Sequence, residues 1–289
     1  MKIVVAIATT GRPAIVSEAL ARLDTQSRAP DAILIVGASE ADAPAASGSA
    51  RFIVAPVKGS GAQRNYALDL VGSSADIVVF IDDDFLAAQG FIEGIERLFS
   101  EHPDIVAASG HLIADGVHCR EALGVDQADA LIAAYAPPSP EEIRIIDDSG
   151  TYGCNMAFRI AAAPHVRFDQ NLPLYAWLED TDFSAFYARV GRVVRTNFFA
   201  GVHLGARSGR TSGLRLGYSQ IANPLYLLRK GTVSPRFALN LAVRNFLANL
   251  VKSARPEPGV DRFGRLRGNL LALLDVARGR SDPRRVLEL

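Results

Sequence analysis

Three consecutive carboxylates, Asp82, Asp83 and Asp84, follow an apolar run at residues 77–81. The run is rich in β-branched residues and is typical of a strand buried on both faces, which would hold the three carboxylates together at its end. Like charges held so closely repel one another unless water screens them or a cation lies nearby. Asp82 and Asp84 would project to the same side and could share one divalent metal ion. An ordinary solvated acidic turn is the alternative.

The segments before this turn alternate between strand and helix patterns. Apolar strands are expected at residues 3–8, 32–36 and 51–55, with helices beginning at Pro13 and spanning residues 62–71. This alternation predicts a doubly wound half-domain with a parallel sheet and right-handed crossovers. Ligands bind at the carboxyl ends of the strands in such sheets, so the acidic turn lies where a ligand is expected.

The rest of the chain has a mixed pattern and then a helical one. The further elements expected are helices at 89–100, 121–135 and 179–190, and strands at 105–109, 143–146, 155–159, 192–195 and 198–203. Three more helices, separated by Gly and Pro, are expected at 212–230, 235–253 and 262–278. The second of these three is amphipathic and should pack on the core, and peripheral contact with the inner face of a membrane is the alternative.

The composition argues against several classes of protein. Apolar residues make up 49% and charged residues 21%, which is typical of a soluble globular protein. The 31 basic and 31 acidic residues balance, so no nucleic-acid partner is expected. No stretch of about 18 uncharged apolar residues occurs, which argues against a membrane-spanning helix. Cys119 and Cys154 lack a C-x-x-C spacing, so we expect a reducing, cytoplasmic compartment.

Five segments, taken in order, resemble the family-2 glycosyltransferases of the GT-A fold. They are residues 8–12, 61–65, 80–84, 153–158 and 177–182, with the sequences ATTGR, GAQRN, FIDDD, GCNMAF and WLEDTD. The resemblance runs from about residue 2 to residue 230 and implies an α/β protein with a Rossmann-like nucleotide-binding half and a mixed central sheet, to which the sequence pattern adds C-terminal helices. The expected division is a catalytic domain at 1–230, with a nucleotide-sugar and metal half at 1–110 and an acceptor half at 111–230, then a helical segment at 231–289.

The resemblance also implies an activity. It is the inverting transfer of one sugar from a nucleotide-diphosphate sugar to a hydroxyl of a glycan or lipid-linked acceptor, with Mn²⁺ or Mg²⁺ as cofactor. Asp82, Asp84 and His203 would hold the metal, although a lone His more often has a structural hydrogen-bonding role. Inversion requires a base opposite the leaving group, and Asp180 matches that position, with Glu179 as its competitor. These two acids could instead only favour the positive end of a helix dipole.

The same resemblance assigns other residues to the two substrates. Those expected to border the nucleotide sugar are Thr9, Arg12, Arg64, Asp83, Arg207 and Arg210, and those expected on the acceptor side are Gly153, Asn155 and Trp177. Plainer alternatives exist, such as a salt bridge for Arg64, backbone packing for Gly153 and core filling for Trp177. The loop that carries the last two arginines could be a lid or a plain solvated loop.

The chain departs from the family pattern after its second strand. The family usually places an aspartate there that grips the nucleotide, whereas this chain has Gly37, and Glu40 or Asp42 would have to substitute. Two other functions therefore stay open. A sugar nucleotidyltransferase would need a Gly-rich, basic loop after the first strand. A non-catalytic nucleotide-sugar-binding protein would have lost activity together with the carboxylate.

Overall fold

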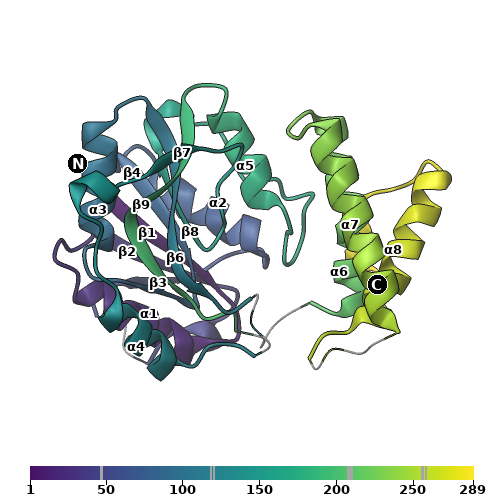
Figure 1. The fold of residues 1–289 in the computed structure, drawn as a ribbon, viewed down its shortest axis with the longest axis horizontal. Helices are drawn as coiled ribbons and strands as arrows, with labels where there is room; N and C mark the ends of the chain where they lie inside the picture. Colours follow the sequence, from purple (N-terminus) through teal and green to yellow (C-terminus); the bar gives the residue numbers. More distant parts are fainter. Residues whose placement is uncertain (46–47, 118, 120, 207–210, 255–256, 258) are drawn as a thin grey trace.

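The computed structural model describes residues 1–45, 48–117, 119, 121–206, 211–254, 257 and 259–289. Figure 1 shows an α/β domain built on one large sheet, with a bundle of three helices standing beside it. The helices of this bundle are α6 (Gly213–Lys230), α7 (Pro235–Ser253) and α8 (Arg262–Ala277). An α/β fold followed by C-terminal helices is therefore confirmed.

The sheet has nine strands in the order β3-β2-β1-β4-β8-β6-β9-β5, with β7 paired to β9. The strands are β1 Ile3–Thr9, β2 Ala32–Gly37, β3 Arg51–Val54, β4 Ile77–Asp82, β5 Phe85–Ala87, β6 Ile105–Asp115, β7 Ile145–Asp147, β8 Asn155–Arg159 and β9 Arg192–His203. Strands β1 to β4 pair in parallel, as the alternating pattern predicts. Strand β8 is antiparallel to both β4 and β6, so the central sheet is mixed.

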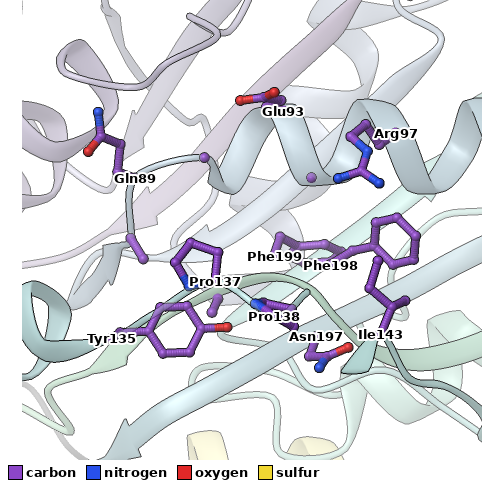
Figure 2. Close-up of a pocket in the computed structure, with 14 residues that line it drawn as sticks. Gln89, Glu93, Arg97, Tyr135, Pro137, Pro138, Ile143, Asn197, Phe198 and Phe199 are labelled. Carbon is purple, nitrogen blue, oxygen red and sulfur yellow. The ribbon is translucent and has the colours of Figure 1, made fainter. Parts of the chain in front are cut away.

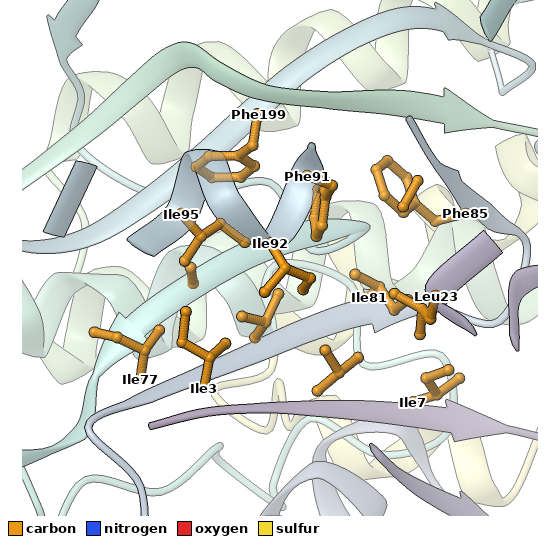
Figure 3. Packing of buried hydrophobic residues seen from close by; sticks show 14 of the residues in the cluster. Ile3, Ile7, Leu23, Ile77, Ile81, Phe85, Phe91, Ile92, Ile95 and Phe199 are labelled. Atoms are coloured by element: carbon orange, nitrogen blue, oxygen red, sulfur yellow. The ribbon is translucent and has the colours of Figure 1, made fainter. Parts of the chain in front are cut away.

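Helices cover both faces of the sheet. They are α1 Pro13–Asp24, α2 Ser60–Val71, α3 Phe91–Glu101, α4 Val125–Ala134 and α5 Glu179–Tyr187. Because successive strand residues point to opposite faces, Ile3 of β1 packs with Phe91 of α3 on one face (Figure 3), whereas Val4 belongs to the cluster with Phe183 of α5 on the other. Residues 77–81 of β4 are at most 1% exposed, which confirms a strand buried on both faces.

Several predicted bounds differ from those observed. The strands expected at 192–195 and 198–203 form one strand, β9, and β6 continues well beyond residue 109. These two strands pair with each other along their length through several register shifts, and that pairing keeps both extended where the local pattern breaks. Strand β5 follows the acidic turn directly and is not among the predicted elements.

The predicted domain limits fall inside packed units. The limit between residues 110 and 111 lies within β6, and the limit between residues 230 and 231 separates α6 from α7. Tyr218 and Ile221 of α6 pack in one buried cluster with Ala242 of α7 and Ala272 of α8. Helix α6 therefore belongs with the C-terminal bundle, because its apolar face is covered by the helices that follow it.

An ion-pair network joins α6 to the α/β domain. The Nζ atom of Lys230 lies 2.6 Å from both Asp169 Oδ2 and Asp182 Oδ2. Asp182 is fully buried, and its other oxygen accepts a hydrogen bond from Thr232 Oγ1 at 2.7 Å. Burial acts to raise the pKa of Asp169, but the hydrogen bonds from Lys230, Asn171 and Tyr226 and the charge of Lys230 together lower that pKa below its ordinary value. Asp169 thus stabilises the junction when it is ionised.

We expect Lys230→Met to lower the free energy of unfolding by about 3 kcal/mol near pH 7, because Asp182 would stay buried without its cation. A carboxyl with a lowered folded-state pKa contributes stability above about pH 4, which is lost as the pH falls through the folded-state pKa. The deficit of the variant should therefore shrink in acid. Urea unfolding of the variant and of the unmodified protein, at pH 7 and again in acid, measures this deficit in the free energy of unfolding.

Lys252→Met is the matched control, since Lys252 pairs with Glu257 on the surface. It should cost less than about 1 kcal/mol. Equal losses in the two variants would contradict a special role for Lys230.

Candidate functional site

Two carboxylates and an imidazole meet at the ends of β4 and β9. Strand β5 pairs antiparallel with the end of β9 and sets Phe85 opposite His203. As a result, Asp82, Asp84 and His203 each place one possible ligand atom in a group whose members lie within 4.8 Å of one another. Carboxylate oxygens and an imidazole nitrogen suit Mn²⁺, and carboxylates with water suit Mg²⁺. The residues present therefore fit the divalent cation that the sequence predicts.

His203 is buried between acidic side chains. Its Nδ1 atom lies 2.9 Å from Asp115 Oδ1, and its Nε2 atom lies 3.3 Å from Asp84 Oδ1. Burial acts to lower the pKa of His203, but hydrogen bonds with Asp115 and Asp84 raise it to about 10. The ring is thus a cation in the metal-free protein, and Nε2 must lose its proton before it can bind a metal ion. Asp115 would meanwhile keep the ring oriented through Nδ1.

The middle carboxylate of the turn has a different environment. Thr9 Oγ1 donates to Asp83 Oδ2 at 2.8 Å, and Arg12 Nη2 lies 2.9 Å from Asp83 Oδ1. Asp83 is 1% exposed, and burial, opposed by Arg12, raises its pKa to about 7. Thr9 at the end of β1 and Arg12 in the loop that follows thus bind both oxygens of Asp83, which also lines the cavity, and its place beside the nucleotide sugar stays a prediction. Thr9 and Arg12 line the same cavity as the metal ligands.

Arg64 links the metal turn to Glu179, the acid next to the predicted base. Its Nη2 atom lies 2.8 Å from Asp82 Oδ1 and donates to the carbonyl oxygen of Gly153 at 3.0 Å, and its Nη1 atom pairs with Glu179. Arg64 is only 3% exposed. The salt bridge given as the alternative for Arg64 is therefore present, while Arg64 also lines the cavity and its contact with the nucleotide sugar stays a prediction.

The two acids at the start of α5 differ in what they contact. Glu179 is buried, accepts a hydrogen bond from Ser60 Oγ at 2.8 Å and pairs with Arg64, and burial raises its pKa to about 7 despite that cation. Asp180 is half-buried, lines the cavity and accepts from the amide of Gly153 at 2.9 Å. Burial also raises the pKa of Asp180, although hydrogen bonds from the backbone amides of Thr181 and Gly153 act to lower it. Asp180 is therefore the more accessible of the two carboxylates.

The loop before α5, residues 174–178, has an uncommon backbone. Leu174, Ala176 and Leu178 have φ angles of 61°, 51° and 74°, a left-handed conformation that costs about 1–3 kcal/mol per residue without glycine. Tyr175 and Trp177 lie between them and line the cavity. We call this segment the aromatic loop. Its conformation presents two aromatic side chains beside the predicted base.

Two hydrogen bonds to other elements hold the aromatic loop. Asn223 Nδ2, from the buried side of α6, donates to the carbonyl oxygen of Trp177 at 2.8 Å. The amide of Ser60, at the start of α2, donates to the carbonyl oxygen of Leu174 at 3.1 Å. The C-terminal bundle therefore contributes directly to the shape of the site.

The cavity has a volume of 760 Å³, enough for a nucleotide sugar and part of an acceptor. Among the residues that line it are Asp82, His203, Gly153, Trp177 and Asp180, together with Lys58 and Arg215, for which the sequence gives no role. Asn155, predicted on the acceptor side, is fully buried in β8 and is not among the lining residues. Its strand pairs with β4 inside the sheet, which withdraws it from the acceptor. Arg207 and Arg210 lie outside the described residues.

The structure shows no free carboxylate for the nucleotide at position 37 or at Asp42. A Cβ at Gly37 would lie 2.7 Å from the ring of Phe52, so a side chain does not fit there. Asp42 is buried and accepts from the amides of Gly11, Ala38 and Ser39. It therefore joins the loops that follow β1 and β2, and it is not among the residues that line the cavity.

A second hollow of 210 Å³ lies between α3 and β9 (Figure 2). Glu93, Arg97, Tyr135 and Asn197 are among its lining residues, and none of the predicted site residues reaches it. Of these two cavities, the larger one is lined by the metal ligands Asp82 and His203, and the smaller one by none of the three.

Comparison with known proteins supports this geometry at the level of fold. No family model matches the sequence, and a search of curated proteins finds no match. Solved structures do match. The mannosyltransferase PcManGT from Pyrobaculum calidifontis, in complex with GDP-Man and Mn²⁺, is 15% identical with a TM-score of 0.54, over 99% of this chain and 85% of that one. This chain has the GT-A glycosyltransferase fold.

Two further structures share the GT-A fold with this chain. Residues 1–349 of TarS from S. aureus, in complex with UDP, are 14% identical with a TM-score of 0.54, over 100% of this chain and 90% of that one. Glucosyl-3-phosphoglycerate synthase from Mycobacterium tuberculosis, in complex with Mn²⁺, UDP and glucosyl-3-phosphoglycerate, is 16% identical with a TM-score of 0.51, over 81% of both chains. The match to TarS includes the C-terminal bundle of this GT-A chain.

We expect Asp84→Asn to weaken Mn²⁺ binding at least about tenfold, because it removes a charged ligand and a partner of His203. Isothermal titration of the purified protein with Mn²⁺ measures the change. Asp126→Asn, at an exposed position of α4, is the control and should bind Mn²⁺ normally. Unchanged Mn²⁺ affinity in Asp84→Asn would disprove the metal assignment.

Asn223→Ala should loosen the aromatic loop, because a strained backbone would lose one of its two anchors. Trp177 is the single tryptophan of the chain, so its fluorescence reports on this loop specifically. We expect stronger quenching by acrylamide and red-shifted emission. Asn245→Ala removes a hydrogen bond between Asn245 and Gln220 inside the bundle, and it should leave the emission unchanged. An unchanged spectrum in Asn223→Ala would show that the loop is held by other contacts.

Proposed function

We propose that this protein is a metal-dependent, inverting glycosyltransferase that moves one sugar from a nucleotide-diphosphate sugar to an acceptor hydroxyl. One observation carries the proposal. Asp82 and His203, two members of the metal-ligand cluster that Asp84 completes, line the same 760 Å³ cavity as the accessible carboxylate of Asp180. The reaction requires a cation that stabilises the leaving diphosphate and a base that accepts the hydroxyl proton. The metal-ligand cluster would hold the cation, and the separate carboxylate would be the base.

Asp82, Asp84 and His203 are the residues that would hold Mn²⁺ or Mg²⁺. The ion would neutralise the negative charge that develops on the departing nucleoside diphosphate. The structural relatives support this choice of cofactor and donor, since PcManGT is in complex with GDP-Man and Mn²⁺, and glucosyl-3-phosphoglycerate synthase is in complex with Mn²⁺ and UDP.

Asp180 acts as the general base in this proposal. The acceptor oxygen forms a bond to the anomeric carbon while the bond from that carbon to the diphosphate oxygen breaks, and the hydroxyl proton passes to Asp180. Attack from the side opposite the diphosphate inverts the configuration of the anomeric carbon. The amide of Gly153 fixes the base, and the raised pKa makes it a better proton acceptor than an ordinary aspartate.

The remaining assignments concern the two substrates. Thr9, Arg12 and Arg64 border the donor, with Arg12 and Arg64 also pairing with carboxylates of the metal turn. Tyr175 and Trp177 offer aromatic faces on which an acceptor sugar can stack. We propose a glycan or lipid-linked acceptor, a cytoplasmic location and membership of the family-2 glycosyltransferases.

We expect Asp180→Asn to lower kcat by about 10²–10⁴-fold while donor binding stays near normal, because the amide cannot accept the proton. Thermal stabilisation by a panel of nucleotide diphosphates with Mn²⁺ first identifies the nucleotide. Transfer from the matching sugar nucleotide, or its slow hydrolysis by the pure protein, then gives the rate. Asp147→Asn, at an exposed position of β7, is the control and should retain full activity.

The outcomes distinguish the competing functions. Near-normal transfer by an Asp180→Asn variant that binds donor would refute the assigned base. A protein that binds a nucleotide sugar with Mn²⁺ but neither transfers nor hydrolyses the sugar would be a binding protein. Full activity in excess EDTA would remove the role given to the metal ligands.

A further inference from the structure

Large apolar side chains are exposed on two helices of the C-terminal bundle. They are between 41% and 68% exposed and comprise Leu239, Val243, Leu247, Leu250 and Val251 on α7, and Phe263, Leu270, Leu273 and Leu274 on α8. The two helices pack against each other at one end of the long axis of the molecule (Figure 1). An apolar surface of this extent is uncommon on a monomeric soluble protein and indicates a binding surface.

The spacing of these residues shows that they do not form the bundle core. Leu239, Val243, Leu247 and Leu250 recur at helical intervals along one side of α7. The residues of α7 that are buried are Ala238, Ala242 and Asn249, which lie on a different side of the helix. Helix α8 is similar, with Phe263, Leu270 and Leu274 exposed while Gly268, Asn269 and Ala272 are buried. Each helix thus has a second apolar side beyond the one that it packs. We call these exposed sides together the outer face.

The charge on the two helices of the outer face is mainly basic. Helix α7 carries Arg236, Arg244 and Lys252 and no acidic residue, and Lys252 pairs with Glu257. The single acidic residue within α8 is Asp275, which is fully buried and paired with Arg280 and Arg285.

The zero net charge of the chain conceals this asymmetry. From residue 213 to the end, 14 Lys and Arg stand against 5 Asp and Glu, whereas the preceding residues have 17 and 26. The C-terminal bundle is therefore strongly basic, and the α/β domain is acidic. A division of this kind favours contact with an anionic surface.

These features select among the possible occupants of the outer face. A symmetric dimer would set the same basic helices against each other, and their charges would repel. An anionic lipid bilayer complements both properties, since apolar side chains enter the headgroup boundary while Arg and Lys contact phosphates. No described helix has the length and apolarity to cross a membrane, so contact would be along the surface.

We propose that the outer face of α7 and α8 docks on an anionic membrane surface. This inference does not depend on the proposed enzymatic function.

Sedimentation with vesicles tests the proposal without any substrate. The full chain should bind phosphatidylcholine vesicles that contain about one third phosphatidylglycerol at least tenfold more strongly than pure phosphatidylcholine vesicles, and added salt should weaken this binding. The double variant Leu247→Glu, Leu274→Glu should lose most of it, because both apolar stripes would carry acids. Ile146→Glu, on the α/β domain at a residue 54% exposed, is the matched control and should bind normally.

A second variant tests whether a loss of vesicle binding comes from misfolding of the first variant. Arg236→Gln with Arg244→Gln keeps the apolar side chains, and it should weaken anionic-vesicle binding and reduce its salt dependence. Circular dichroism and the unfolding temperature confirm that each variant is folded. The proposal is wrong if the full chain fails to sediment with anionic vesicles, or if it binds neutral vesicles equally well. It is also wrong if the double variant converts a dimer into a monomer without changing vesicle binding, since the outer face would then be a subunit interface.

Discussion

Charge compensation at the end of β4 is the constraint on which the rest of the structure depends. The carboxylates at residues 82–84 can be held together because Arg64, Arg12 and His203 each pair with a different one. The three cations come from α2, from the loop after β1 and from β9, so distant segments must meet at this turn. Only the imidazole can give up its charge by losing a proton, whereas an arginine cannot. Loss of that proton would free Nε2 of His203 for a metal ion, while both arginines keep their charge.

Much of this arrangement can be predicted from the sequence because its signals are local. The strand at 77–81, the parallel β1 to β4 unit and the C-terminal helices follow from apolar periodicity. The five ordered segments predict the fold, and the ends of β4 and β9 bring Asp82, Asp84 and His203 together where a metal was expected. The roles of Asp180 and of the substrate-bordering residues stay predictions until variants are assayed.

Other features cannot be predicted because they depend on contacts between distant segments. Asp115 reaches His203 only because β6 continues past the end of its local strand pattern, guided by β9. Asp83 is bound by Thr9, and Asn155 is buried in β8, through the packing of segments that are distant in the sequence. The anchor that Asn223 supplies to the aromatic loop comes from a helix whose sequence carries no motif. A single sequence gives no direct signal for such pairs.

Helix α6 has a consequence for how the chain can be divided. One of its sides packs with α7 and α8, while Asn223 and Lys230 hold the aromatic loop and α5. A fragment cut after residue 230 to isolate a minimal enzyme would expose Tyr218 and Ile221 to solvent, and aggregation would follow from that apolar surface. A fragment cut before α6 would lose an anchor of the cavity wall. Neither cut would therefore leave both the bundle core and the cavity wall intact.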